Sequence, residues 1–212
     1  MDKKFTYYEN ILSLELINEL HDFYYGNILD MSRNVYGNGL VDAFLVGEWR
    51  AVLPSTINLS KEFQLRIIEE LYNNENLPFY KNKKMIRTVG ELPMRINNFL
   101  PGGKFPPHTD NAWGSMTLFL NKEWKPEWGG NFVWYEDEDT NQENGHSIAP
   151  NYNCGILDCY PEATQGALHR VEEVTHERIT IQAFFGLGED YINIGNIPEK
   201  YKYMVPDSPK YS

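Results

Sequence analysis

Hydrophobic positions recur at helical spacing in two early segments of the chain. Ser13 is a plausible N-cap for the first apolar stripe, which consists of Leu16, Ile17, Leu20, Phe23 and Tyr24. A second stripe follows Ser60 and ends before Pro78; its members are Phe63, Ile67, Ile68, Leu71 and Tyr72. The pattern predicts two amphipathic helices, whereas residues 33–58 between them show no clear period.

From about residue 92 the hydrophobic period changes from helical to strand-like. Clusters of Gly, Pro and Asn separate the alternating segments, which are residues 94–100, 115–121, 131–135, 146–150, 153–160 and 178–185. Many short strands joined by short turns are typical of an antiparallel sandwich or barrel. The chain is therefore expected to be α+β, with its N-terminal helices bracing one face of a sheet.

The chain length fits one domain. We expect residues 1–212 to form a single unit, because no linker or internal repeat divides the 212 residues. Within it we expect a helical N-terminal part at 1–90, a β core at 91–188 and a tail at 189–212.

Charge and cysteine content exclude several classes of partner. Acidic residues outnumber basic ones by 30 to 19, for a net charge of −11, and no basic cluster is present, so no nucleic-acid partner is expected. Cys154 and Cys159 form neither a disulfide framework nor a C-x-x-C zinc pair. The sequence shows no signal peptide and no apolar run long enough to span a membrane, so a cytoplasmic protein is expected.

A histidine and a carboxylate stand two residues apart at His108 and Asp110. In an extended strand such residues point to the same side, about 6.6 Å apart, so both could bind one metal ion. The alternative is a polar turn after a proline pair. Two histidines and one carboxylate form the facial metal site of non-haem Fe(II) oxygenases. His169 is a candidate for the second histidine, and His176 competes with it.

The last alternating segment adds a cation to this set. Arg178 opens it, and Thr180 lies two residues on, on the same side of an extended strand. An arginine with a neighbouring hydroxyl can bind a small carboxylate through two hydrogen bonds.

Four motifs in residues 95–186 carry a family resemblance. They are RINNFLPGGKFPPHTD, TLFLNKEW, WGGNFVWY and LHRVEEVTHERITIQAFF, in this order along the chain. Together they resemble the Fe(II)/2-oxoglutarate-dependent dioxygenases, in particular the prolyl 4-hydroxylase-like branch. The resemblance implies a double-stranded β-helix, a jelly roll of two sheets with the metal at its open end.

The resemblance also implies roles for single residues. His108, Asp110 and His169 would bind Fe(II), and Arg178 would bind the far carboxylate of 2-oxoglutarate with help from Thr180. The co-substrates implied are 2-oxoglutarate and O₂, with ascorbate as a reductant, and the co-products are succinate and CO₂.

The sequence departs from this branch at two positions. Many relatives have tyrosine where this chain has Phe119, and another position that is often tyrosine is Phe99. Support for the co-substrate carboxylate must then come from elsewhere, and Thr117 is a candidate beside Thr180. On the substrate side, Asn97 and Trp113 are the candidate contacts.

The expected reaction is hydroxylation of an unactivated C–H, most simply in a prolyl residue of a peptide or protein. The intact carboxylate at Asp110 argues against halogenation, which needs that position vacated. A free amino acid or small metabolite is the alternative substrate. Nucleic-acid demethylation is disfavoured because position 184 is Phe184, where that branch has a second arginine. A non-catalytic metal-binding jelly roll is the alternative of a different class, and the oligomeric state stays open.

Overall fold

The computed structural model describes most of the two helices and of the β core. The residues described are 5–27, 54–77, 94–109, 114–136, 145–159 and 167–185, together with the backbone of four short strands between residues 35 and 52. The expected tail at 189–212 lies outside these residues.

Both predicted helices are confirmed. α1 (Leu14–Asn27) begins after Ser13, whose Oγ accepts a hydrogen bond from the Leu16 N–H at 3.2 Å. α2 (Lys61–Asn73) begins after Ser60, whose Oγ accepts from the Phe63 N–H at 3.2 Å. Each serine satisfies one of the N–H groups that the first turn of a helix leaves unpaired. None of the described helices is long and apolar enough to cross a membrane.

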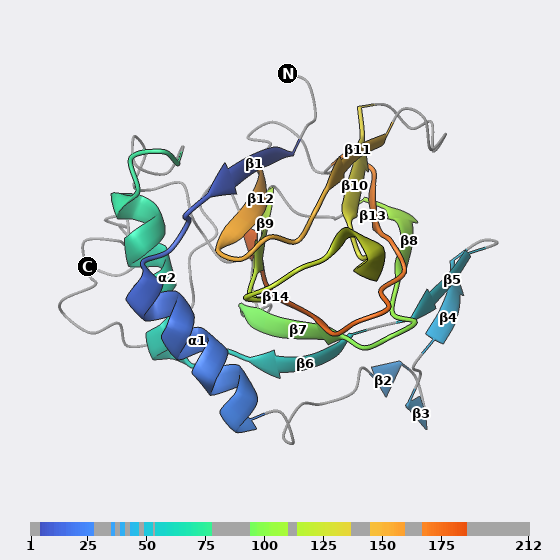
Figure 1. The fold of residues 1–212 in the computed structure, drawn as a ribbon, viewed down its shortest axis with the longest axis horizontal. Coiled ribbons are helices and arrows are strands. Elements are labelled where there is room, and N and C mark those ends of the chain that lie inside the picture. The colour runs from blue at the N-terminus through green and yellow to red at the C-terminus, as the bar shows by residue number, and fades with distance from the viewer. Residues whose placement is uncertain are drawn as a thin grey trace, which may run out of the picture.

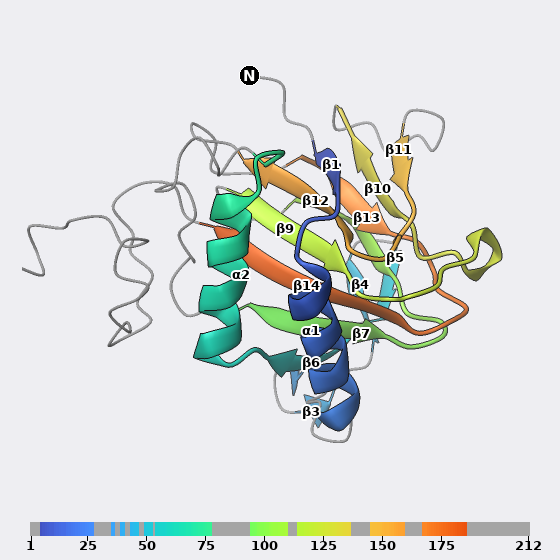
Figure 2. The same cartoon turned by 60° about the vertical axis from the view of Figure 1, so that its left-hand side comes forward.

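The β core consists of two antiparallel sheets that face each other (Figure 1). The major sheet has the order β1 (Thr6–Glu9), β12 (Cys154–Cys159), β9 (Gly114–Phe119), β14 (Arg178–Phe185), β7 (Arg95–Phe99), β6 (Ser55–Asn58). The minor sheet has the order β11 (Gly145–Ile148), β10 (Phe132–Tyr135), β13 (His169–Val171), β8 (Phe105–His108). This is the expected jelly roll, and the two helices lie against the outer face of its major sheet (Figure 2).

The expectation of a helical N-terminal part at 1–90 was incomplete. β1 and β6 belong to this part and form the two edges of the major sheet. Two further hairpins lie there as well, made of β2 (Val35–Tyr36) with β3 (Gly39–Leu40) and β4 (Ala43–Val46) with β5 (Trp49–Val52). Strands of two to four residues are too short for a period of two to stand out, and edge strands are only partly buried.

Alternation in β14 separates two cores. Ile179 and Ile181 belong to the core between the major sheet and the helices. Arg178 and Thr180 point the other way, toward the space between the two sheets, because successive side chains of a strand lie on opposite faces. A smaller apolar cluster fills this interior; its residues are Phe5, Phe119, Phe132, Trp134, Cys154, Ile156 and Ala167. Polar residues of β14 thus face an interior lined by aromatic rings.

Candidate functional site

Two histidines meet at the junction of β8 and β13. His108 is the last residue of β8 and His169 the first of β13, and the two are direct partners in the antiparallel register. Their ring centroids lie 4.2 Å apart. Residues 61 positions apart in the sequence are therefore held side by side by backbone pairing.

Both imidazole rings are oriented in the same way. His108 Nδ1 lies 2.8 Å from the Pro106 carbonyl oxygen, and His169 Nδ1 lies 2.9 Å from the Ala167 carbonyl oxygen. A carbonyl only accepts hydrogen bonds, so each Nδ1 carries a proton, and in the neutral ring the lone pair is then on Nε2. Histidines that bind metal are typically held by such a hydrogen bond from the second ring nitrogen. The pair therefore fits a metal ion.

His169 is enclosed by aromatic rings. Its ring stacks on Phe132 with centroids 5.0 Å apart and meets the edge of Phe5 at 5.1 Å. Burial, and secondarily the neighbouring His108, lower the pKa of His169 to about 3. The imidazole is thus neutral at physiological pH, which is the form that binds a metal.

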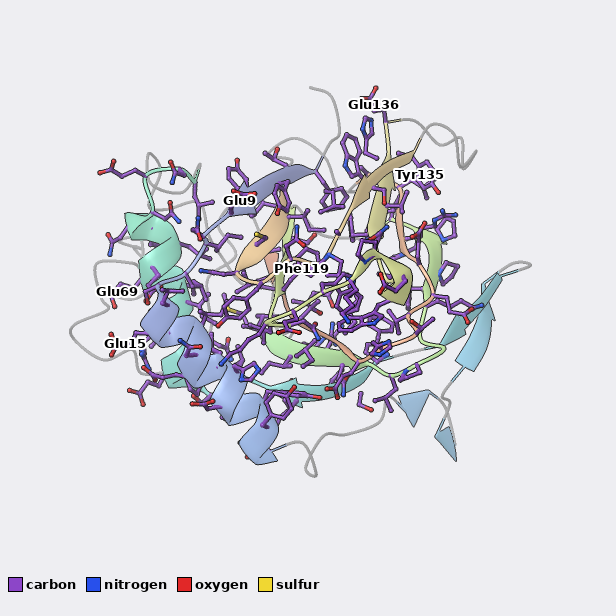
Figure 3. The ribbon with its side chains drawn as sticks, viewed as in Figure 1. Glu9, Glu15, Glu69, Phe119, Tyr135 and Glu136 are labelled. Carbon is purple, nitrogen blue, oxygen red and sulfur yellow. The ribbon has the colours of Figure 1, made fainter. Side chains whose placement is uncertain are left out.

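Arg178 lies inside the same interior, and among the residues that the structure describes no carboxylate forms an ion pair with it. It is only 1% exposed, and its Cζ lies 5.2 Å from the ring centroid of Phe119 and 5.8 Å from that of Phe99. Figure 3 shows Phe119 in the middle of the molecule, between the sheets. Burial lowers the pKa of Arg178 to about 9, so the guanidinium is still a cation at neutral pH.

The guanidinium of Arg178 has hydrogen-bond donors that could bind a carboxylate. Within the described part of the chain, its Nε and Nη2 atoms are buried and have no hydrogen-bond partner. An unpaired buried cation is costly, and a bidentate carboxylate offsets this cost with two charge-assisted hydrogen bonds. The observed geometry fits the far carboxylate of a small dicarboxylate.

A row of polar side chains continues from Arg178 along the inner face of the major sheet. Thr180 lies between Asn97 and Phe119 in the register, and Gln182 lies beside Thr117 in the next row of the same face. Asn97 donates a hydrogen bond from Nδ2 to Gln182 Oε1 at 2.9 Å. From the strand rise, these two rows lie about 7 and 13 Å from Arg178.

The candidate residues from the sequence have different places in the structure. His108, His169 and Arg178 line one interior, because His169 packs on Phe132 and Arg178 on Phe119 of the same cluster. Asp110 and Trp113 lie outside the described residues.

His176, the competing histidine, lies at the surface. Its ring stacks on Trp128 with centroids 4.2 Å apart and an interplanar angle of 14°, and it is not next to His108 in the register. His169 is the histidine that the fold brings to His108.

Phe5 touches His169 and was not among the residues singled out from the sequence. It precedes β1, the strand that joins the major sheet beside β12, and its ring also meets Phe132 at 4.8 Å. An aromatic residue before a short edge strand has no local signal for such a role, because the contact depends on how the chain is placed at the edge of the sheet.

Comparison with known proteins matches the segment that carries these residues to a family model. The model of the 2OG-Fe(II) oxygenase superfamily matches residues 94–186, which contain His108, Asp110, His169 and Arg178. In the sequence comparison with curated proteins, no relative matches the chain.

Solved structures with the same fold include several prolyl hydroxylases. A prolyl-4-hydroxylase of Pseudomonas putida aligns with a TM-score of 0.59 at 13% identity, covering 87% of this chain and 93% of that one. A prolyl hydroxylase of Trichoplax adhaerens, in complex with a hypoxia inducible factor peptide fragment, aligns with a TM-score of 0.62 at 14% identity, covering 86% and 83%. The viral collagen prolyl hydroxylase of Paramecium bursaria Chlorella virus-1, in a 2OG complex, gives 0.55 at 14% identity, covering 86% and 95%. Residues 94–186 of this chain are therefore a domain of the 2OG-Fe(II) oxygenase superfamily, the 2-oxoglutarate-dependent dioxygenases, and the domain is prolyl hydroxylase-like in its fold.

Proposed function

We propose that this domain holds Fe(II) through His108, Asp110 and His169, binds 2-oxoglutarate through Arg178, and hydroxylates a prolyl residue in a peptide or protein. When bound, the iron and 2-oxoglutarate supply the oxidising power for hydroxylating a C–H with O₂, with succinate and CO₂ as co-products. One observation carries the proposal. Two histidines whose rings lie side by side, each held through Nδ1 by a main-chain carbonyl, share their interior with a buried arginine whose Nε and Nη2 have no hydrogen-bond partner among the described residues.

The chain's own residues bind and orient the co-substrate, and they exclude water from the site. Arg178 holds the far carboxylate where the dielectric is low and the attraction is strong, and Thr180, 2% exposed on the same face, is placed to add a hydroxyl contact. Thr117 lies two rows from Arg178, so we propose for it a contact nearer to the metal end. The aromatic rings around His169 exclude water from its imidazole and keep the orientation of this ring fixed.

Peptidyl proline is the substrate that the fold and the charge of the chain favour. Of the similar structures, one is a prolyl hydroxylase in complex with a peptide fragment and another is a collagen prolyl hydroxylase. The net charge of −11 attracts basic peptides and repels nucleic acids. We propose Asn97 as a substrate contact, since it is buried on the inner face beyond Arg178. Trp113, outside the described residues, stays a prediction from the sequence.

The proposal is tested by succinate release with Fe(II), 2-oxoglutarate and ascorbate across three sets of compounds. These are proline-containing peptides, free amino acids and methylated oligonucleotides. We expect release above the substrate-free rate for peptides, together with the gain of one oxygen atom on proline in the mass spectrum. Turnover confined to free amino acids or to oligonucleotides would replace the proposed substrate. The absence of 2-oxoglutarate consumption in every set would contradict the oxygenase activity itself.

Phe119→Tyr is expected to strengthen binding of 2-oxoglutarate. A tyrosine here would add a hydroxyl beside Arg178, whose guanidinium lies 5.2 Å from the Phe119 ring centroid. One added hydrogen bond to a carboxylate should lower the KM for 2-oxoglutarate by about threefold or more, measured from initial rates of succinate formation.

A control separates this gain from a general change of the site. 2-Oxopentanoate has the same 2-oxo acid group but no far carboxylate, so its affinity should not improve in Phe119→Tyr. An equal gain for both acids would show that the new hydroxyl acts elsewhere.

A further inference from the structure

Asn121 fixes the main chain on both sides of Arg178. Its Nδ2 donates a hydrogen bond to the Glu177 carbonyl oxygen at 2.8 Å, and its Oδ1 accepts one from the Ile179 N–H at 2.7 Å. Glu177 and Ile179 are the residues directly before and after Arg178. A single side-chain amide therefore holds the main chain on both sides of the residue that is proposed to bind the far carboxylate.

This amide extends the hydrogen-bonded pairing between β9 and β14. The last residue pair of the β9–β14 ladder is Phe119 with Thr180, and β9 ends at Phe119. The Leu120 N–H then donates to the Ile179 carbonyl oxygen at 3.0 Å. Asn121 continues the pairing with its side chain, which offers one donor and one acceptor as a peptide group does. The pairing of β14 with β9 is thereby extended to its first residue, Arg178.

The side chain of Arg178 passes over a position that has no side chain. A Cβ at Gly130 would lie 3.1 Å from Arg178 Cδ and 2.5 Å from Val174 Cγ1, and Gly130 has a φ of +68°. Glycine meets both demands at once, close approach and positive φ. The path of the Arg178 side chain is therefore shaped by a loop that precedes β10 in the sequence.

A buried network ties the same segment to α1. The Glu177 carboxylate oxygen Oε1 accepts hydrogen bonds from the Tyr24 hydroxyl at 2.5 Å and from Asn98 Nδ2 at 2.8 Å. Asn98 Nδ2 also donates to the Tyr24 hydroxyl at 2.7 Å. The residue before Arg178 is thus anchored through its side chain as well as through its carbonyl group.

We propose that Asn121 is a positioning residue for co-substrate binding: it holds Arg178 in the place and direction that the far carboxylate of 2-oxoglutarate requires. This inference rests on the proposed role of Arg178. Asn121 acts through Arg178, because both of its hydrogen bonds end on the main chain that flanks it.

The test measures the Kd of 2-oxoglutarate for the protein loaded with Mn(II) in place of Fe(II), by titration calorimetry. Asn121→Ala should raise this Kd by at least about tenfold, since small displacements of a positioned group have effects of this size or larger. The Kd of Mn(II) itself should change by less than about twofold, because the histidine pair lies in the other sheet. If Asn121→Ala does not fold, Asn121→Ser is used, whose hydroxyl is too short to reach both main-chain groups.

Asn74→Ala is the matched control. Asn74 also ties a neighbouring segment through its side-chain amide, donating to the Asn10 and Ile11 carbonyl oxygens at 3.1 Å each, at the end of α2. Its loss should leave the Kd of 2-oxoglutarate unchanged. An equal rise in Asn74→Ala and Asn121→Ala would overturn the proposal, because a general loss of stability would then explain both.

A double-mutant cycle separates this inference from the proposed function. In an Arg178→Met background, Asn121→Ala should change the Kd by less than about twofold, since the group that it positions is gone. A further tenfold rise in that background would overturn the positioning role, as would an unchanged Kd in Asn121→Ala alone. If Arg178→Met itself leaves the Kd unchanged, the proposed role of Arg178 is wrong, and the inference falls with it.

Discussion

His169→Ala is expected to abolish turnover, lowering kcat by about three orders of magnitude or more at saturating 2-oxoglutarate. The variant removes one of two imidazole rings whose centroids lie 4.2 Å apart, and two ligands hold Fe(II) far less firmly than three. The measurements are the initial rate of succinate formation and the iron content after dialysis against a defined Fe(II) concentration. Both should fall together.

His176→Ala is the control for this variant. It makes the same chemical change seven residues downstream, at an exposed ring that stacks on Trp128. Its kcat and iron content should stay close to those of the unchanged protein. Loss of turnover in His176→Ala with turnover retained in His169→Ala would reverse the ligand assignment.

Arg178→Met is expected to raise the KM for 2-oxoglutarate by about a hundredfold, while kcat at saturation falls much less. Hydrogen bonds between a guanidinium and a carboxylate contribute about 1.5–3 kcal/mol each, and the Nε and Nη2 donors of Arg178 have no other partner in the described part of the chain. Initial rates over a range of 2-oxoglutarate concentrations give both constants. A fall in kcat as large as the rise in KM would contradict a role confined to binding.

The same variant should not lose stability when co-substrate is absent. Methionine removes a buried cation that has no counter-ion among the described residues and keeps a long apolar side chain between Phe99 and Phe119. We expect the Tm of Arg178→Met without 2-oxoglutarate to equal or exceed that of the unchanged protein. With Mn(II) present throughout, addition of 2-oxoglutarate should raise the Tm of the unchanged protein and leave that of Arg178→Met unchanged, because a ligand stabilises the state that it binds.

Arg170→Met is the matched control. Arg170 is 9% exposed in β13, but its Nη2 donates to Glu172 Oε1 at 3.2 Å, so its charge is paired. This variant should lower the Tm and leave the KM for 2-oxoglutarate unchanged. A rise in KM as large as that of Arg178→Met would mean that any buried arginine of the core has this effect.

The helices and most strands of the core could be predicted from the sequence because their signals are local. α1 and α2 begin after the predicted caps Ser13 and Ser60, and β14 has the bounds of the alternating segment 178–185. The edge strands β1 and β6 could not be predicted, because an edge strand of four residues takes its place from its neighbour in the sheet.

For the site, the sequence supplied the residue types and the structure their arrangement. Spacing singled out His108, His169 and Arg178, but it left His176 as a competitor and gave no ring orientation. The register between β8 and β13 decides which histidine lies beside His108. Phe119 was visible as a departure from relatives, whereas its packing against the Arg178 guanidinium is a tertiary contact that no local pattern encodes.

An anaerobic titration of the purified protein with Fe(II) and 2-oxoglutarate tests the central claim most directly. If His108, Asp110 and His169 hold iron and Arg178 directs 2-oxoglutarate onto it, a weak visible charge-transfer band should appear only when both are present. The band should be absent in His169→Ala and should need a far higher 2-oxoglutarate concentration in Arg178→Met. A correctly folded, unchanged protein that shows no band at saturating Fe(II) and 2-oxoglutarate would contradict the account.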